Sequence, residues 1–145
     1  MRSRWKYLDE IDFQKNRKYI KQYLPYALQI ESLENRLTEL NYKIDSISSP
    51  IVTGQPGGGE KRELADDLAK KEELKSRIDS LVSESKSIKN DLLNCIDRIG
   101  NPIQANVLEL RYIDAMNVAQ IGDVLGYSVR QVIRQCNKGI SRIKF

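Results

Sequence analysis

The sequence predicts an all-α protein in which a long antiparallel helical hairpin, resembling a coiled coil, precedes a small C-terminal helix-turn-helix unit. Apolar residues recur at alternating spacings of three and four in two separate stretches, and a segment rich in Gly and Pro divides them. Helix-capping residues then punctuate the last third of the chain. We therefore predict two domains, a helical hairpin over residues 1–99 and a helix-turn-helix domain over residues 100–145.

The first stretch predicts helix over residues 13–47. Pro25 lies inside this stretch, so it should kink the chain or start a new helix near Tyr26. The aromatic residues before the seam are expected to cover one end of the helices: Trp5, Tyr7, Phe13, Tyr19, Tyr23 and Tyr26. The seam itself has the a/d spacing of a coiled coil and comprises Ile30, Leu33, Leu37, Leu40, Ile44 and Ile47.

The second stretch predicts a long helix over residues 60–99. Residues 48–59 are a loop by composition and lack the spacing of a phosphate-binding loop, because Glu60 separates Gly59 from the next lysine. Two seams joined by a loop predict an antiparallel hairpin. Such a hairpin shields its seam only in part, so we expect a third covering element or a second subunit. The second seam comprises Leu74, Ile78, Leu81, Ser85, Ile88, Leu92, Cys95 and Ile99.

Composition argues against an enzyme. The chain has 145 residues and no histidine, which removes histidine-based acid–base catalysis and histidine-containing metal sites. Cys95 and Cys136 form no C-x-x-C pair, and we interpret both as small apolar residues on helix faces in a reducing compartment. The sequence indicates no catalytic, cofactor-binding or metal site, no signal peptide and no membrane span. We expect a soluble cytoplasmic protein.

The C-terminal region contains three helix starts. Asn101 can cap a helix that has Pro102 at its first position. After a break at Asp114-Ala115-Met116, the pattern N-x-x-Q at 117–120 starts a short helix over Val118 to Leu125. The pattern S-x-x-Q at 128–131 is a capping box and opens the last helix.

The last two helices have the spacing of a helix-turn-helix. Ile121 and Leu125 are expected to face Val132 in the last helix. Gly122 lies where the helices should approach most closely, and Gly126 suits a left-handed turn. Tyr127 is also expected to cover the crossing.

The last helix separates apolar from basic residues. At 100° per residue, Val129, Val132, Cys136, Ile140 and Ile143 form the expected core face. Arg130, Gln131, Arg134, Lys138 and Ser141 form the opposite face. After Asp123 the chain contains no acid but five basic residues. A polyanion contact explains this pattern, and so does a solvated basic face on a structural helix. The candidate DNA-binding residues are Ser128, Arg130, Gln131, Arg134, Lys138 and Arg142.

The C-terminal region resembles region four of bacterial sigma factors. The matching residues are V-L-x-L-R-Y at 107–112, I-G-x-x-L-G-Y-S-x-x-x-V at 121–132 and the basic last helix. The whole architecture is similar to the RinA/ArpU group of phage-encoded late transcription regulators. The resemblance implies a recognition helix that starts at Ser128 and contacts DNA through Val129, Arg130, Gln131, Ile133 and Arg134. Gly139 inside that helix, and Gln135 at a position that is often apolar, depart from the common pattern.

The resulting hypothesis is a sequence-specific DNA-binding regulator of transcription, acting as an activator of phage or prophage late genes in a bacterial host. Its partners would be double-stranded DNA, RNA polymerase and further copies of the chain through the hairpin. One alternative is a DNA-packaging protein resembling the terminase small subunit. Another is a coiled-coil interaction protein without DNA specificity.

Overall fold

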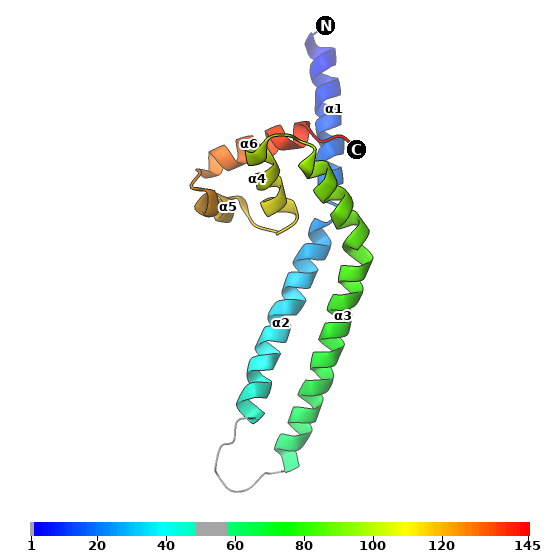
Figure 1. Cartoon of the computed structure of the whole chain (residues 1–145), viewed down its shortest axis with the longest axis vertical. Coiled ribbons are helices and arrows are strands. Elements are labelled where there is room, and N and C mark those ends of the chain that lie inside the picture. Colours follow the sequence, from blue (N-terminus) through cyan, green and yellow to red (C-terminus); the bar gives the residue numbers. More distant parts are fainter. Residues whose placement is uncertain (1, 49–57) are drawn as a thin grey trace. The chain divides into compact units, whose positions relative to one another are not determined.

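The computed structural model describes residues 2–48 and 58–145, and these residues form an all-α fold, as predicted. The described residues contain helices and turns and no strands (Figure 1). In chain order the helices are α1 (Arg2–Ile20), α2 (Leu24–Ser48), α3 (Gly58–Asp97), α4 (Pro102–Tyr112), α5 (Val118–Leu125) and α6 (Val129–Ser141).

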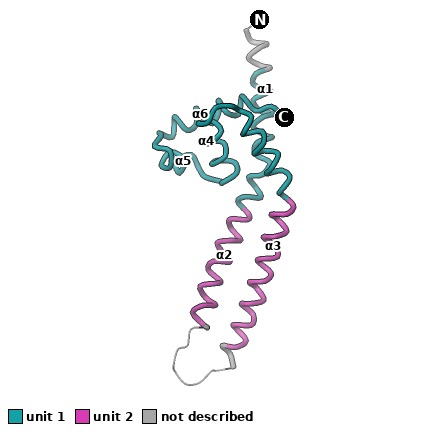
Figure 2. Tube along the Cα trace, in the orientation of Figure 1, with its two compact units in different colours: residues 1–28, 85–145 teal, residues 29–84 magenta. Residues whose placement is uncertain are grey.

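The chain divides into two compact units (Figure 2). Unit 1 comprises Met1–Leu28 with Ser85–Phe145, and unit 2 comprises Gln29–Glu84. This division differs from the predicted boundary between residues 99 and 100. The reason is that Ile20 and Leu92, from the ends of α1 and α3, belong to the same hydrophobic core as the C-terminal helices.

The core of unit 1 is densely apolar. Its fully buried side chains come from α1, α3, α4, α5 and α6, so distant parts of the chain share one interior. The apolar side chains with at most 1% exposure are Ile20, Leu92, Ile96, Val107, Leu108, Ile121, Val132 and Ile140. Burial of this kind is the main favourable term in folding, because each such side chain contributes about 1.5–3 kcal/mol on leaving water.

A short turn separates α1 from α2, and Pro25 is the second residue of α2. Of the two alternatives predicted for Pro25, a kink or a new helix near Tyr26, the structure shows a new helix, which begins at Leu24. A proline is tolerated at its position because the first turn of a helix does not use that backbone N–H. The predicted helix over 13–47 is two helices, and α1 extends further toward the N-terminus. Among the predicted aromatic cover, Tyr23 is buried in the unit 1 core, and Phe13, Tyr19 and Tyr26 pack against it.

Side-chain contacts also join α1 to the C-terminal segment and to α3. The Asn16 side-chain amide donates to the Ile140 carbonyl at 2.9 Å, which satisfies a carbonyl near the C-terminus of α6. The rings of Tyr19 and Phe145 stack with centroids 4.1 Å apart. The Tyr19 hydroxyl lies 3.6 Å from the Cys95 thiol, and this contact together with burial raises the pKa of Tyr19 to about 12.

In unit 2, α2 and α3 run side by side as an antiparallel hairpin (Figure 1). Ile30, Leu33 and Ile44 of the predicted seam are buried, whereas Leu37, Leu40 and Ile47 are half-buried. The seam residues of α3 in this unit, Leu74, Ile78 and Leu81, are half-buried too. The hairpin prediction is confirmed. Most of the predicted loop over residues 48–59 lies outside the described residues, and α3 begins at Gly58 rather than at residue 60.

The seam of α3 extends further than predicted and includes a buried acid. The three–four spacing continues backward from Leu74 through Lys71 and Asp67 to Leu64. Asp67 is only 2% exposed. Its carboxylate pairs with the Lys43 ammonium at 3.3 Å, and Glu63 lies 3.4 Å from the same nitrogen. Hydrogen bonds to Asp67 and then to Glu63 raise the pKa of Lys43.

Candidate nucleic-acid interface

Local sequence signals position α5 and α6. The Asn117 side chain accepts from the Gln120 backbone at 2.8 Å, and Gln120 accepts from the Asn117 backbone at 3.0 Å. Ser128 and Gln131 make the same reciprocal pair at the start of α6. Both capping boxes satisfy backbone N–H groups that a helix start otherwise leaves without partners. Each predicted helix start is confirmed.

The turn between α5 and α6 requires glycine at two positions. Gly126 has φ +73°, a left-handed conformation that costs other residues about 1–2 kcal/mol. A Cβ on Gly122 would lie 2.6 Å from the Tyr127 carbonyl oxygen, so no larger side chain fits without a backbone shift. Ile121 and Val132 are fully buried beside it. The predicted close approach at Gly122 and the left-handed turn at Gly126 are therefore confirmed. Leu125 packs against the core that contains Ile121 and Val132.

One face of α6 packs into the unit 1 core. Val132, Cys136 and Ile140 are buried, as predicted, and so is Ile143 beyond the helix end. Val129 was also predicted on this face, but it is 44% exposed and that assignment was wrong. Val129 is the first residue of α6, where the helix has not yet reached the core.

Gly139 has a packing role in α6. A Cβ at this position would lie 2.9 Å from a methyl carbon of Leu108 and 3.4 Å from the Gln104 Cβ. A side chain at residue 139 would therefore require the buried Leu108 side chain to move. This close approach of residue 139 to Leu108 explains the departure from the common recognition-helix pattern, since the lower helix propensity of glycine is offset by packing.

The opposite face of α6 carries the predicted basic residues. Arg130, Arg134 and Lys138 are all exposed and recur every four residues, so their Cα atoms follow one side of the helix about 6 Å apart. Arg142, directly after the helix, is exposed as well. Among the described residues no carboxylate pairs with any of these four side chains. The structure thus exposes all four of these predicted site residues and places three of them in one row along α6.

Ser128 and Gln131 are engaged in the capping box. The Gln131 side-chain oxygen accepts from the Ser128 backbone N–H at 2.9 Å and from the Ser128 hydroxyl at 3.3 Å. The Ser128 hydroxyl in turn accepts from the Gln131 backbone at 3.2 Å. A bidentate contact of Gln131 with adenine would need the same oxygen and would have to open the cap. These two residues fix the start of α6.

Two further residues belong to the exposed face: Ile133, a DNA contact that the resemblance implies, and Asn137, which is not among the predicted residues. Ile133 is 44% exposed and lies one turn beyond the equally exposed Val129. Asn137 is exposed between Arg134 and Lys138. Helical periodicity alone could have identified Asn137, because it lies three residues after Arg134 on the same side. The face therefore combines cationic, amide and apolar side chains.

The described residues contain no cluster of side chains that could serve as ligands to a metal ion. Among residues 2–48 and 58–145, no three Cys, Asp or Glu side chains are grouped to hold one. Burial raises the pKa of the Cys136 thiol, which disfavours the thiolate that a metal or an electrophile would need. In the same part of the chain, no helix has the length and apolar character needed to cross a membrane.

The fold and the surface together define the chain as an all-α protein with a helical hairpin and a C-terminal helix-turn-helix unit. Residues 46–143 match the model of the DUF1492 family, which is described as a protein of unknown function. Because this match spans more than half of the chain, the protein belongs to the DUF1492 family. No curated protein and no solved structure matches the chain.

Proposed function

We propose that this protein is a non-catalytic, sequence-specific DNA-binding regulator of transcription whose helix α6 enters the major groove. The observation that carries the proposal is the exposed row of Arg130, Arg134 and Lys138 on the second helix of a helix-turn-helix. Long basic side chains without acid partners suit a surface that neutralises phosphates and reads base edges. The absence of acids after Asp123 strengthens this interpretation.

The basic and apolar side chains of the exposed face have different roles in this proposal. Arg130 and Arg134 are long enough to donate bidentately to guanine, the commonest specific contact in the major groove. Lys138 and Arg142 lie further along the chain and suit phosphate oxygens. Ile133, together with Val129, offers apolar contact to thymine methyl groups. Ser128 and Gln131 hold the N-terminus of α6 in position.

The resemblance to sigma region four and to the RinA/ArpU group supports a role in transcription activation, and it points to late genes of phages or prophages. In that setting the protein acts in the cytoplasm of a bacterial host. The helical front half would then contact RNA polymerase or join copies of the chain. The separate packing of unit 2 supports this division of labour, because the hairpin is formed without residues of the helix-turn-helix.

The proposal is tested by selection of duplexes from a random DNA library, with binding to the enriched duplex then measured across a salt series. We expect one enriched motif, bound more tightly than random duplex DNA at physiological salt. The affinity should fall as salt rises, because phosphate contacts release counterions. A library that yields no motif, with weak binding that disappears at physiological salt, would overturn the proposal.

A further inference from the structure

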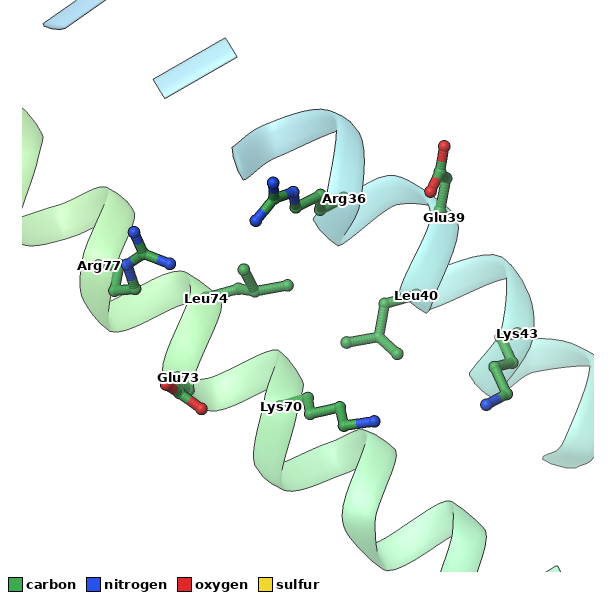
Figure 3. Close-up of a pocket in the computed structure, with 8 residues that line it drawn as sticks. All are labelled: Arg36, Glu39, Leu40, Lys43, Lys70, Glu73, Leu74 and Arg77. Carbon is green, nitrogen blue, oxygen red and sulfur yellow. The ribbon is translucent and has the colours of Figure 1, made fainter. Parts of the chain in front are cut away.

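Unit 2 contains a groove between α2 and α3 that the proposed DNA contact does not use. Its volume is about 390 Å³. The residues that line it define what we name the cationic groove: Arg36, Glu39, Leu40, Lys43, Lys70, Glu73, Leu74 and Arg77 (Figure 3). All eight lie within Gln29–Glu84, so the groove belongs to the hairpin alone.

The groove has an apolar floor. Leu40 and Leu74 point toward one another from the two helices (Figure 3). Both are seam residues that the hairpin leaves half-buried. An apolar side chain from a partner that covered them would remove further apolar surface from water, which favours association.

The sides of the groove carry like charges. Arg36 and Lys43 extend from α2, and Lys70 and Arg77 extend from α3 (Figure 3). These residues directly precede the seam positions Leu37, Ile44, Lys71 and Ile78. Such flanking positions in coiled coils usually hold charges of opposite sign that pair across the helices. Here cations of the two helices face one another, and repulsion between like charges disfavours the isolated hairpin.

Acids within the hairpin compensate only one of the four cations. Lys43 pairs with Glu63 and Asp67. Arg36, Lys70 and Arg77 form no ion pair with a carboxylate in the described part of the chain. Glu39 and Glu73 line the outer edges of the groove and point away from the space between the helices (Figure 3). Three cations thus surround a pair of half-buried leucines.

We propose that the cationic groove binds an acidic amphipathic helix of a partner protein. Apolar residues of that helix would cover Leu40 and Leu74, and its carboxylates would pair with Arg36, Lys70 and Arg77. This is the helix-in-groove mode of recognition, in which apolar anchors provide affinity and charged flanks provide specificity. The docked helix would be the third covering element that a two-helix seam needs.

A protein helix fits the groove better than nucleic acid does. The phosphates of a nucleic-acid backbone could pair with the cations but would make no apolar contact with Leu40 and Leu74. An amphipathic helix could contact the leucines with its apolar side chains and the cations with its carboxylates. Residues 29–84 also carry eight basic and twelve acidic side chains, a net charge of −4. A DNA duplex is wide enough to bring phosphates close to the acidic outer faces of the hairpin, which would repel them. A single docked helix would contact only the groove and would avoid this repulsion.

The test uses the full chain and a synthetic helical peptide with leucine at every a and d position and glutamate at every e and g position. Fluorescence anisotropy measures its affinity for the wild type, for the triple variant Arg36→Gln, Lys70→Gln, Arg77→Gln, and for Lys75→Gln. Lys75 is an exposed lysine of α3 outside the groove, so it serves as the matched control. We expect the triple variant to lose at least tenfold in affinity and the control to keep it.

A second peptide, with glutamine in place of each glutamate, keeps the test independent of variant folding. We expect the wild type to bind this peptide at least tenfold more weakly. Circular dichroism should show that the triple variant keeps its helicity and melting temperature, because neutralisation removes repulsion between like charges. Equal binding of the two peptides, or equal affinity of the wild type and the triple variant, would contradict the proposal.

The same variants also test two other possible ligands of the groove, nucleic acid and a second copy of the chain. If the triple substitution weakens binding of random-sequence duplex DNA and the peptide does not bind, the groove serves nucleic acid and the proposal is overturned. If the wild type is a dimer by sedimentation equilibrium and the triple variant is a monomer, the occupant is a second copy of the chain and the proposal is likewise overturned. None of these variants alters α6, so the outcome is independent of the proposed DNA contact.

Discussion

The two units of this protein bury their apolar residues to different extents. In unit 1, Leu108, Ile121 and Val132 are fully buried, and residues distant in sequence share the same core. In unit 2, seam residues such as Leu40 and Leu74 stay half-buried, and a charged residue, Asp67, occupies a buried seam position. Unit 1 contains its own hydrophobic core, and unit 2 contains a seam that two helices cover only in part.

This difference indicates how each unit can act. A helix that is fixed by a complete core, as α6 is, presents its exposed side chains in a defined geometry, which base reading requires. A half-covered seam gains stability from a partner, because the partner removes more apolar surface from water. The proposed recognition of DNA would therefore belong to unit 1, and the proposed recognition of a protein helix would belong to unit 2.

The largest expected effect is on core stability. Leu108→Ala should destabilise unit 1 by about 3–4 kcal/mol, because it opens a cavity where α4 meets α6. Leu40→Ala should destabilise unit 2 by only about 1 kcal/mol, because that side chain is half-buried before the substitution. Amide hydrogen exchange, read separately for peptides of α6 and α2, measures both losses. Equal losses would remove the distinction between the units.

The second prediction concerns pH. Burial and the neighbouring Cys136 thiol, 3.8 Å from its hydroxyl, raise the pKa of Tyr112 to about 12. Because the folded pKa exceeds the ordinary value of 10.0, the contribution of Tyr112 is complete below pH 10. It is lost as the pH rises toward 12, by up to about 3 kcal/mol.

Urea unfolding at pH 9, 10, 11 and 12 measures this loss. Tyr112→Phe removes the titrating group, so the free energy of unfolding of the variant should fall less steeply across this range. Parallel curves for the wild type and the variant would show that the Tyr112 hydroxyl titrates alike in the folded and unfolded chains.

The third and smallest expected effect lies in the hairpin. Asp67→Leu places an apolar residue at a buried seam position and should stabilise unit 2 by about 1 kcal/mol. Lys43→Met should lower its stability, because it leaves the Asp67 carboxylate buried without its cation. Hydrogen exchange in α2 reports both changes. A loss of stability in Asp67→Leu would mean that the acid itself is needed in the seam.

Much of the fold could be predicted from local signals. Asn101, Asn117 and Ser128 start helices because their side chains accept from backbone N–H groups, and such caps depend on only a few neighbouring residues. The seams could be predicted because helical periodicity is equally local. The division into units could not, since it depends on Ile20 and Leu92 meeting residues far away in sequence.

In the candidate site, too, features set by local sequence could be predicted, and features set by packing between helices could not. The exposure of Arg130 and Arg134 follows from helical periodicity, and the sequence predicted it. The role of Gly139 did not follow, because only the packing of α4 against α6 brings Leu108 within 2.9 Å of the point that a Cβ of residue 139 would occupy. The charge pattern of the sequence likewise did not indicate the cationic groove. The residues of this groove come from both α2 and α3, so their proximity depends on how the two helices are aligned.

We propose that α6 reads DNA sequence, and the substitution Arg134→Ala tests this proposal at one exposed arginine of that helix. The measurement compares the affinities of the wild type, Arg134→Ala and the control Lys86→Ala for the selected duplex and for a random duplex. Lys86 is an exposed lysine of α3. We predict that Arg134→Ala loses about 1–3 kcal/mol on the selected duplex and much less on the random duplex, and that the control keeps its preference. Equal losses on both duplexes would contradict base reading by α6.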